Sequence, residues 1–141
     1  MKLNSVKIDA ARADAGQWFD AGKFEPRMRG MRLKVRAFGN VDDQAVSRRE
    51  RDALSVHERL PGSTAAQAAA TRILNARLSE AILTGWEGIE DEDGAPLPFS
   101  AEKALEILGD PDFRLFRDTV VVIAELASQG HAEALEADAK N

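Results

Sequence analysis

Three short stretches near the N-terminus are strand candidates, and two of them, residues 5–9 and 31–38, alternate apolar and polar residues as half-buried strands do. The first is residues 5–9, with Val6 and Ile8, and the second is residues 16–20, with Trp18 and Phe19. Residues 31–38 give the clearest pattern, in which Met31, Leu33, Val35 and Ala37 alternate with Arg32, Lys34 and Arg36. With residues 9–14 as a connection and residues 21–30 as a loop, the pattern predicts a small antiparallel sheet with one basic face.

Helical periodicity dominates the rest of the chain. A charged helix is predicted over residues 41–60, with Asp42 or Asp43 as its N-cap. Ser63 starts a longer helix that runs to Thr84 and carries a continuous apolar stripe. That stripe consists of Ala66, Ala69, Ala70, Ile73, Leu74, Leu78, Ala81 and Ile82.

Two further helices are predicted after residue 99. The first covers residues 100–108 and turns Ala104, Leu105 and Leu108 inward. The second begins at Pro111 with Asp110 as N-cap and ends near Ser128.

The predicted fold class is α+β, with a small N-terminal antiparallel sheet packed against a mainly helical C-terminal two-thirds. We expect a β-rich part over residues 1–40 and a helical part over residues 41–130, with a hairpin-like loop at 85–99. Residues 131–141 are expected to form a mobile tail. At 141 residues, these parts form one domain.

Glycines, prolines and acidic residues interrupt the helices between residues 82 and 100. Gly85 is expected to end the long helix in a left-handed conformation, and Asp93-Gly94 to form a turn. Trp86 and Phe99 should pin this loop between two helices, while Trp18 holds the sheet. With Gly94 at the sixth position of a calcium loop, Ile89 and Ser100 would occupy its first and twelfth positions, where carboxylates are expected. The acidic run over residues 90–93 is therefore predicted to be a solvated turn and not a calcium site.

Composition removes several kinds of site. The chain has no cysteine, which excludes disulfides and thiolate chemistry, and only His57 and His131 carry imidazole. No apolar run approaches the roughly 20 residues that span a bilayer, and the N-terminus lacks a signal-peptide pattern. We expect a soluble cytoplasmic protein that is not an enzyme and has no catalytic residues, cofactor or metal.

Two surfaces are candidates for binding a partner. The basic stretch over residues 27–36, with Arg32, Lys34 and Arg36 on its strand face, could bind nucleic acid as a small regulatory protein does, but no aromatic residue sits among the basic positions of that face to stack on bases. With a net charge of −5, an acidic protein partner fits better. The other surface is the wide apolar face of the last helix. This face could pack in the centre of the domain. Alternatively, it could contact another copy of the chain or a partner through Phe113, Leu115, Val122 or Leu126.

The order of these patterns resembles the phage tail assembly chaperones, small proteins encoded just before the tape measure protein in long-tailed phages and prophages. The resemblance rests on Gly16-Gln-Trp-Phe19 with the strand over residues 33–40, on the long helix that leads into Leu83-Thr-Gly-Trp-Glu-Gly-Ile89, and on residues 90–100 with the short helix and Asp-Pro break that follow. Together these segments cover roughly residues 5–128.

The resemblance implies a chaperone that coats the aggregation-prone tape measure protein and keeps it soluble in the host cytoplasm. It also implies a homo-oligomer, the tail tube protein as a further partner, and absence from the mature virion. In this family a −1 frameshift often extends the product, and Lys140-Asn141 is compatible with such a slip. Membrane and nucleic acid are not expected partners.

Overall fold

The structure is a computed structural model that describes residues 2–6 and 10–129. Its three strands form one antiparallel sheet in the order β1-β2-β3: β1 (Gln17–Asp20), β2 (Arg32–Val35) and β3 (Leu83–Glu87). The helices are α1 (Ala10–Ala15), α2 (Val41–Asp52), α3 (Thr64–Arg77), α4 (Ala101–Gly109) and α5 (Arg114–Ser128). The α+β fold class is confirmed.

The N-terminal prediction is partly wrong. Residues Leu3–Val6 form a 3-10 turn where a strand was expected, and the rest of that expected strand lies outside the described residues. The predicted connection at residues 9–14 contains the short α1 helix. The predicted tail at residues 131–141 also lies outside the described part of the chain.

The third strand of the sheet is β3, which the sequence pattern did not indicate. The α3 helix continues as a π-helical turn, Leu78–Ile82, and passes directly into β3. Gly85 therefore lies inside a strand, and it is not among the glycines with positive φ. The prediction that Gly85 ends the helix in a left-handed conformation is therefore wrong, and the Trp18 ring packs over Gly85, where an added Cβ would lie 3.4 Å from it.

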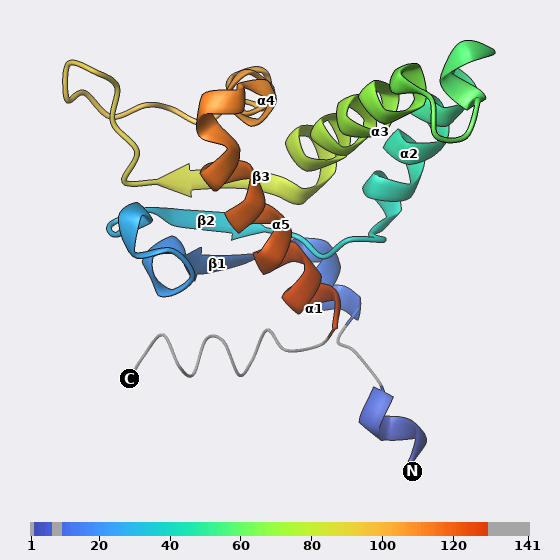
Figure 1. Cartoon of the computed structure of the whole chain (residues 1–141). Helices are drawn as coiled ribbons and strands as arrows, with labels where there is room; N and C mark the ends of the chain where they lie inside the picture. Colours follow the sequence, from blue (N-terminus) through green and yellow to red (C-terminus); the bar gives the residue numbers. More distant parts are fainter. Residues whose placement is uncertain (1, 7–9, 130–141) are drawn as a thin grey trace.

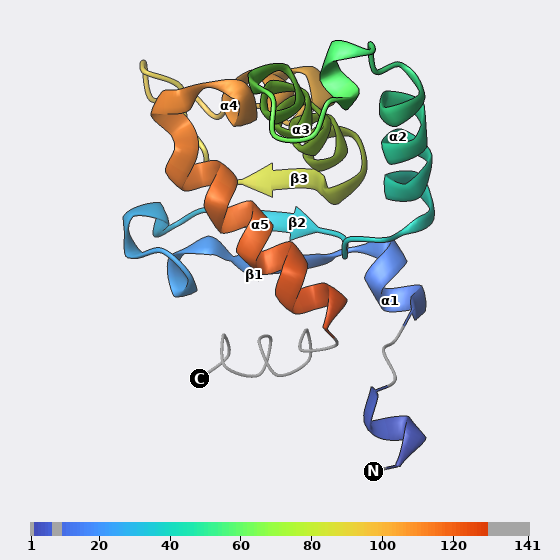
Figure 2. The same ribbon diagram turned by 45° about the vertical axis from the view of Figure 1, so that its right-hand side comes forward.

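Figures 1 and 2 show α5 crossing one face of the sheet, while α2 and α3 extend from one end of the molecule. Phe19, Leu33, Val35, Leu83 and Trp86 lie on the covered face and are buried. They pack in one core with the inner side of α5, which contributes Phe116, Val120, Ile123, Ala124 and Ala127. Burial of this apolar area is the main stabilising term of the fold.

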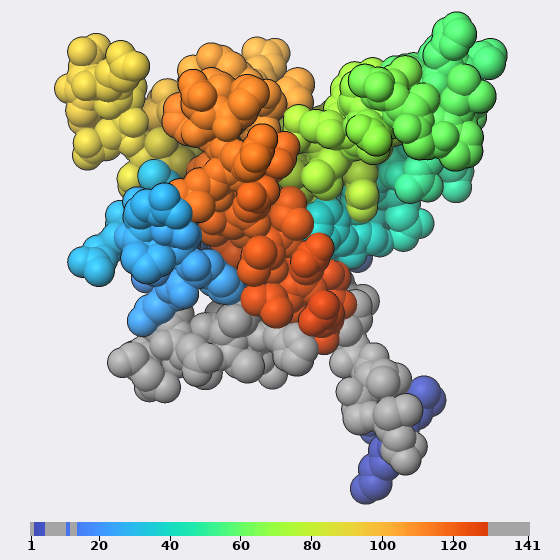
Figure 3. Space-filling view, viewed as in Figure 1, coloured from blue at the N-terminus to red at the C-terminus, as the bar shows by residue number. Residues whose placement is uncertain are grey.

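The loop after β3 is a small hairpin, as expected. Glu90 and Pro96 form an antiparallel bridge, and Gly94 turns the chain at φ +84°. Trp86 pins the hairpin, because its indole N–H donates to the Leu97 carbonyl at 2.7 Å and its ring packs edge-on against Phe99 at 4.9 Å. Figure 3 shows this hairpin, in yellow, projecting from one end of the molecule.

Caps bound the helices where local signals are strong. Ser63 accepts from the Ala66 N–H and Ser100 from the Lys103 N–H, as predicted. Asp110 accepts from the Asp112 N–H but caps a 3-10 turn, Pro111–Phe113, and α5 begins after it at Arg114 without a side-chain cap. The cap of α2 is Asn40, whose side chain accepts from the Asp43 N–H, so the choice of Asp42 or Asp43 is wrong. That helix also ends at Asp52, ahead of the predicted residue 60.

Candidate partner-binding surfaces

A buried ion pair joins the start of α2 to the end of α3. The Asp43 carboxylate, which is 1% exposed, accepts from Arg77 Nε at 2.6 Å and from Arg77 Nη2 at 2.9 Å. It also accepts from the Gly39 N–H at 2.8 Å, and the Arg77 guanidinium stacks on the Phe38 ring at 5.1 Å. The bidentate geometry satisfies both carboxylate oxygens, and charge-assisted pairs of this kind are the strong ones.

Opposing effects set the pKa of Asp43. Burial alone raises it, but the hydrogen bonds from Arg77 and Gly39 outweigh burial and hold the pKa of the carboxyl below its ordinary value. In turn the Asp43 carboxylate raises the pKa of Arg77. Both groups are therefore charged at neutral pH, and the pair acts as a structural clamp between two helices.

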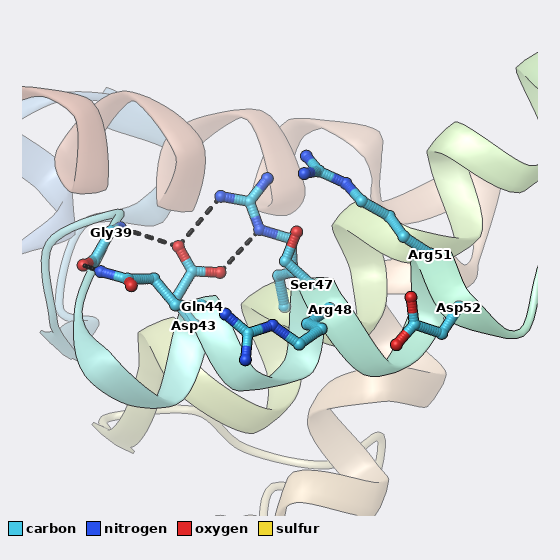
Figure 4. Close-up of a pocket in the computed structure, with 8 residues that line it drawn as sticks. Gly39, Asp43, Gln44, Ser47, Arg48, Arg51 and Asp52 are labelled. Atoms are coloured by element: carbon cyan, nitrogen blue, oxygen red, sulfur yellow. Dashed lines mark hydrogen bonds and ion pairs between the residues drawn. The ribbon is translucent and has the colours of Figure 1, made fainter.

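An open groove of about 370 Å³ lies along α2 beside this clamp (Figure 4). Its lining residues are Gly39, Asp43, Gln44, Ser47, Arg48, Arg51, Asp52 and Arg77. Within the described residues, no carboxylate pairs with Arg48 or Arg51, and Figure 4 shows both side chains extended without an interaction. We call this feature the α2 groove.

The outer side of α5 carries a line of apolar side chains. Val122 is 45% exposed, Leu115 and Leu126 are half-buried, and Phe113, just before the helix, is 49% exposed. Leu115, Val122 and Leu126 are spaced by seven and four residues, as positions of a coiled-coil seam are, and Thr119, the position between Leu115 and Val122, is buried at 6% exposure. Thr119 fits there because its hydroxyl donates to the Leu115 carbonyl at 2.8 Å.

We call Phe113, Leu115, Val122 and Leu126 the α5 seam. Asp118 and Glu125 are exposed along one side of it. On the opposite side, the helix is buried in the core through Phe116 and Ile123. The seam is thus a strip of apolar surface with an acidic rim, which can accept another helix.

The basic strand face does exist, but two of its three charges are engaged within the chain. Arg32 pairs with Glu87 at 3.3 Å, and Arg36 pairs with Asp42 at 2.7 Å and donates to the Asp14 carbonyl. Lys34 lies between them and is half-buried.

The expectation that no aromatic residue sits on the basic strand face is wrong. Trp18 of β1 is opposite Lys34 and therefore shares its face. The Arg32 guanidinium covers the Trp18 ring at 5.3 Å, so this ring is a packing element under an arginine.

The α2 groove was not found from the sequence. Asp43 was predicted only as a possible cap, and Arg77 only as a residue off the apolar stripe of its helix, because their contact spans 34 positions and no local pattern encodes it. The one available signal was the almost wholly charged stretch of residues 47–52, which was interpreted either as solvated helix surface or as a surface that pairs across an interface. The α5 seam, in contrast, could be read from helical periodicity.

Other kinds of site are absent from the described part of the chain. No group of histidine, cysteine or carboxylate side chains there could hold a metal ion. None of its helices is long and apolar enough to cross a membrane.

Comparison with known proteins gives one match. Residues 40–141 match the family of the YdaY prophage protein, a range that begins at the Asn40 cap and includes α2, the α2 groove, β3, the hairpin and the α5 seam. No curated protein and no solved structure matches the chain. Because the matched range covers most of the sequence, this chain belongs to the YdaY prophage protein family.

Proposed function

We propose that the chain is a prophage tail assembly chaperone, which binds the long helical tape measure protein and keeps it soluble while the tail is built. The observation that carries the proposal is the α5 seam: exposed and half-buried apolar side chains along one side of the helix, in a member of a prophage family. The resemblance of the strand, helix and hairpin order to that chaperone family supports it. The proposal places the protein in the host cytoplasm, outside the mature virion, and assigns it no catalytic reaction.

The seam suits a helical partner because Leu115, Val122 and Leu126 lie on one side of α5 at spacings of seven and four residues. Helix-in-groove recognition uses anchors at this spacing. Asp118 and Glu125 on the rim favour lysine or arginine at the flanking positions of the partner helix, as charges beside a coiled-coil seam do.

Binding at one such site should be weak. Fully burying a large apolar side chain contributes about 1.5–3 kcal/mol, and the seam residues are already half-buried. Each therefore adds roughly 1 kcal/mol, and the four together, about 4 kcal/mol, correspond to a Kd of only about 1 mM before the costs of association. A long partner with repeated sites compensates, because neighbouring bound copies raise one another's effective concentration.

The test is co-expression with the tape measure protein encoded by the same prophage. The wild-type chain should keep that protein in the soluble fraction, and Val122→Glu should lower the soluble amount severalfold. Leu105→Glu is the matched control, because Leu105 on α4 is 46% exposed against 45% for Val122. Both variants should keep the wild-type circular dichroism spectrum.

The proposal fails if the wild-type chain does not raise the solubility of the tape measure protein. It also fails if Val122→Glu and Leu105→Glu behave alike. We do not advance the nucleic-acid reading of the basic strand face, because Arg32 and Arg36 already pair with carboxylates of the same chain.

A further inference from the structure

The tip of the hairpin carries unpaired negative charge on a rigid support. Glu90, Glu92 and Asp93 are exposed and form no ion pair within the described residues. Asp91 has a structural task instead, since its Oδ1 accepts from the N–H groups of Asp93 at 2.9 Å and Ala95 at 3.0 Å. A partner that binds this acidic tip therefore meets a pre-ordered loop, which lowers the entropy cost of association.

The α2 groove offers the opposite charge. Its floor is the Asp43–Arg77 clamp, in which the two charges neutralise each other. Among residues 2–6 and 10–129, nothing pairs with the guanidinium groups of Arg48 and Arg51, and apart from the clamp the only other charged side chain that lines the groove is Asp52. The groove therefore presents unpaired donors beside an open hollow, and guanidinium groups bind carboxylates by two parallel hydrogen bonds.

The two complementary features lie at opposite ends of the molecule. Both views of the ribbon place the hairpin at one end and α2 at the other (Figures 1 and 2). One molecule cannot bring them together, whereas two copies in the same orientation can.

We propose that the acidic hairpin tip of one copy docks in the α2 groove of the next, with Glu90, Glu92 and Asp93 facing Arg48 and Arg51. Because the two surfaces differ, the contact is heterologous, and repeated contacts produce a ring or an open helical row. The inference rests on the proposed function, since a row of copies along one tape measure helix gives this contact its purpose.

The strength of the contact should depend on salt. Exposed ion pairs are individually weak, and their attraction is screened within about 10 Å at 0.1 M salt and about 3 Å at 1 M salt. The contact should therefore form at high protein concentration or among copies held on one partner, where the effective concentration is in the millimolar range.

The test is charge-swap complementation, followed by sedimentation velocity of the chain alone at low salt. One variant carries Arg48→Glu and Arg51→Glu, and the other carries Glu90→Lys, Glu92→Lys and Asp93→Lys. Each variant alone should associate at least about tenfold more weakly than wild type, because like charges then meet. A mixture of the two should recover association, since each acidic groove now meets a basic hairpin and each acidic hairpin a basic groove.

A Lys23→Glu, Arg29→Glu variant is the matched control, because it changes the net charge by the same amount as the groove variant at exposed positions outside the groove. It should associate as wild type does, and half-molar salt should dissociate the wild-type assembly. A monomeric wild-type chain at low salt and roughly millimolar concentration overturns the inference. An unmixed variant that associates like wild type, or a mixture that does not recover, overturns it as well.

The same variants separate this inference from the proposed function. Each has an intact α5 seam and should still bind a single helical segment of the tape measure protein. Loss of that binding in the groove variant, with self-association intact, would assign the groove to the tape measure protein and overturn docking between copies. Self-association by charge swap without any tape measure binding would instead overturn the proposed function.

Discussion

Replacing Trp86 by alanine should remove the anchor of the hairpin and open a cavity in the core. The ring is 6% exposed and packs edge-on against Phe99 at 4.9 Å and Phe116 at 6.3 Å. A buried aromatic side chain covers about 150–250 Å², which corresponds to about 4–6 kcal/mol at 25 cal/mol per Å² as an upper bound. Since alanine keeps part of this contact, and tryptophan-to-alanine changes cost about 3–5 kcal/mol, we expect a loss of about 4 kcal/mol.

Urea unfolding followed by far-ultraviolet circular dichroism measures this loss. With a slope of about 2 kcal/mol per M, the midpoint of Trp86→Ala should fall by about 2 M. Circular dichroism is preferable to fluorescence because Trp18 also emits. A midpoint within about 0.3 M of wild type would refute the argument that this ring organises the core.

Trp86→Phe is the matched control. It keeps an aromatic ring against Phe99 and Phe116 but removes the hydrogen bond to the Leu97 carbonyl. A lost bond that leaves one partner unsatisfied costs about 1–2 kcal/mol, so this variant should fall between wild type and Trp86→Ala. If Trp86→Phe were as unstable as Trp86→Ala, the hydrogen bond would account for the effect and the packing would not.

Two further predictions concern the clamp and the glycines. Asp43→Asn leaves the Arg77 charge without its carboxylate and should lower the free energy of unfolding by about 3 kcal/mol at pH 7. The pKa of Asp43 in the folded chain lies below its ordinary 3.8. The clamp therefore stabilises the wild type above about pH 4, and this stabilisation is lost as the pH falls through the lower pKa. Thermal unfolding from pH 2 to pH 7 should therefore show the two proteins converging in acid, and a constant difference would contradict the charge argument. Gly88→Ala should cost roughly 3 kcal/mol or more in urea unfolding, because its φ is +78° and a Cβ would collide with the Gly30 carbonyl oxygen. Gly94→Ala, at φ +84° with open space around it, should cost only about 1 kcal/mol, and equal losses in the two variants would show that the close approach does not matter.

Local chemistry made part of the fold predictable. Ser63, Ser100 and Asp110 cap helices because a short polar side chain meets the free N–H groups of the next turn, which needs no distant residue. Asp93-Gly94 turns the hairpin for a similar reason. The apolar face of α5 followed from its period of 3.6 residues. Leu105 in α4, which was expected to turn inward, is instead 46% exposed.

Distant contacts account for what the sequence did not reveal. The β3 strand has no clean alternation, because the register shifts between Lys34 and Val35 of its partner strand. Gly85 looked like a helix end because no local signal shows that the Trp18 ring crosses it. The Asp43–Arg77 clamp, and with it the α2 groove, forms only where α2 and α3 pack together. The sequence of neither helix alone shows that they will be neighbours.

The order in which the sheet is assembled bears on how the chain leaves the ribosome. β2 is made early, yet the strand on one side of it, β3, comes only after α2 and α3. The helix that covers Leu33 and Val35, α5, comes last. Until then the nascent β1-β2 pair has an open edge and an uncovered apolar face, and both invite pairing with a neighbouring nascent chain. Folding should therefore be completed only after α5 has emerged, and slower translation of α2 and α3 should lengthen the period in which chains on one messenger can pair wrongly.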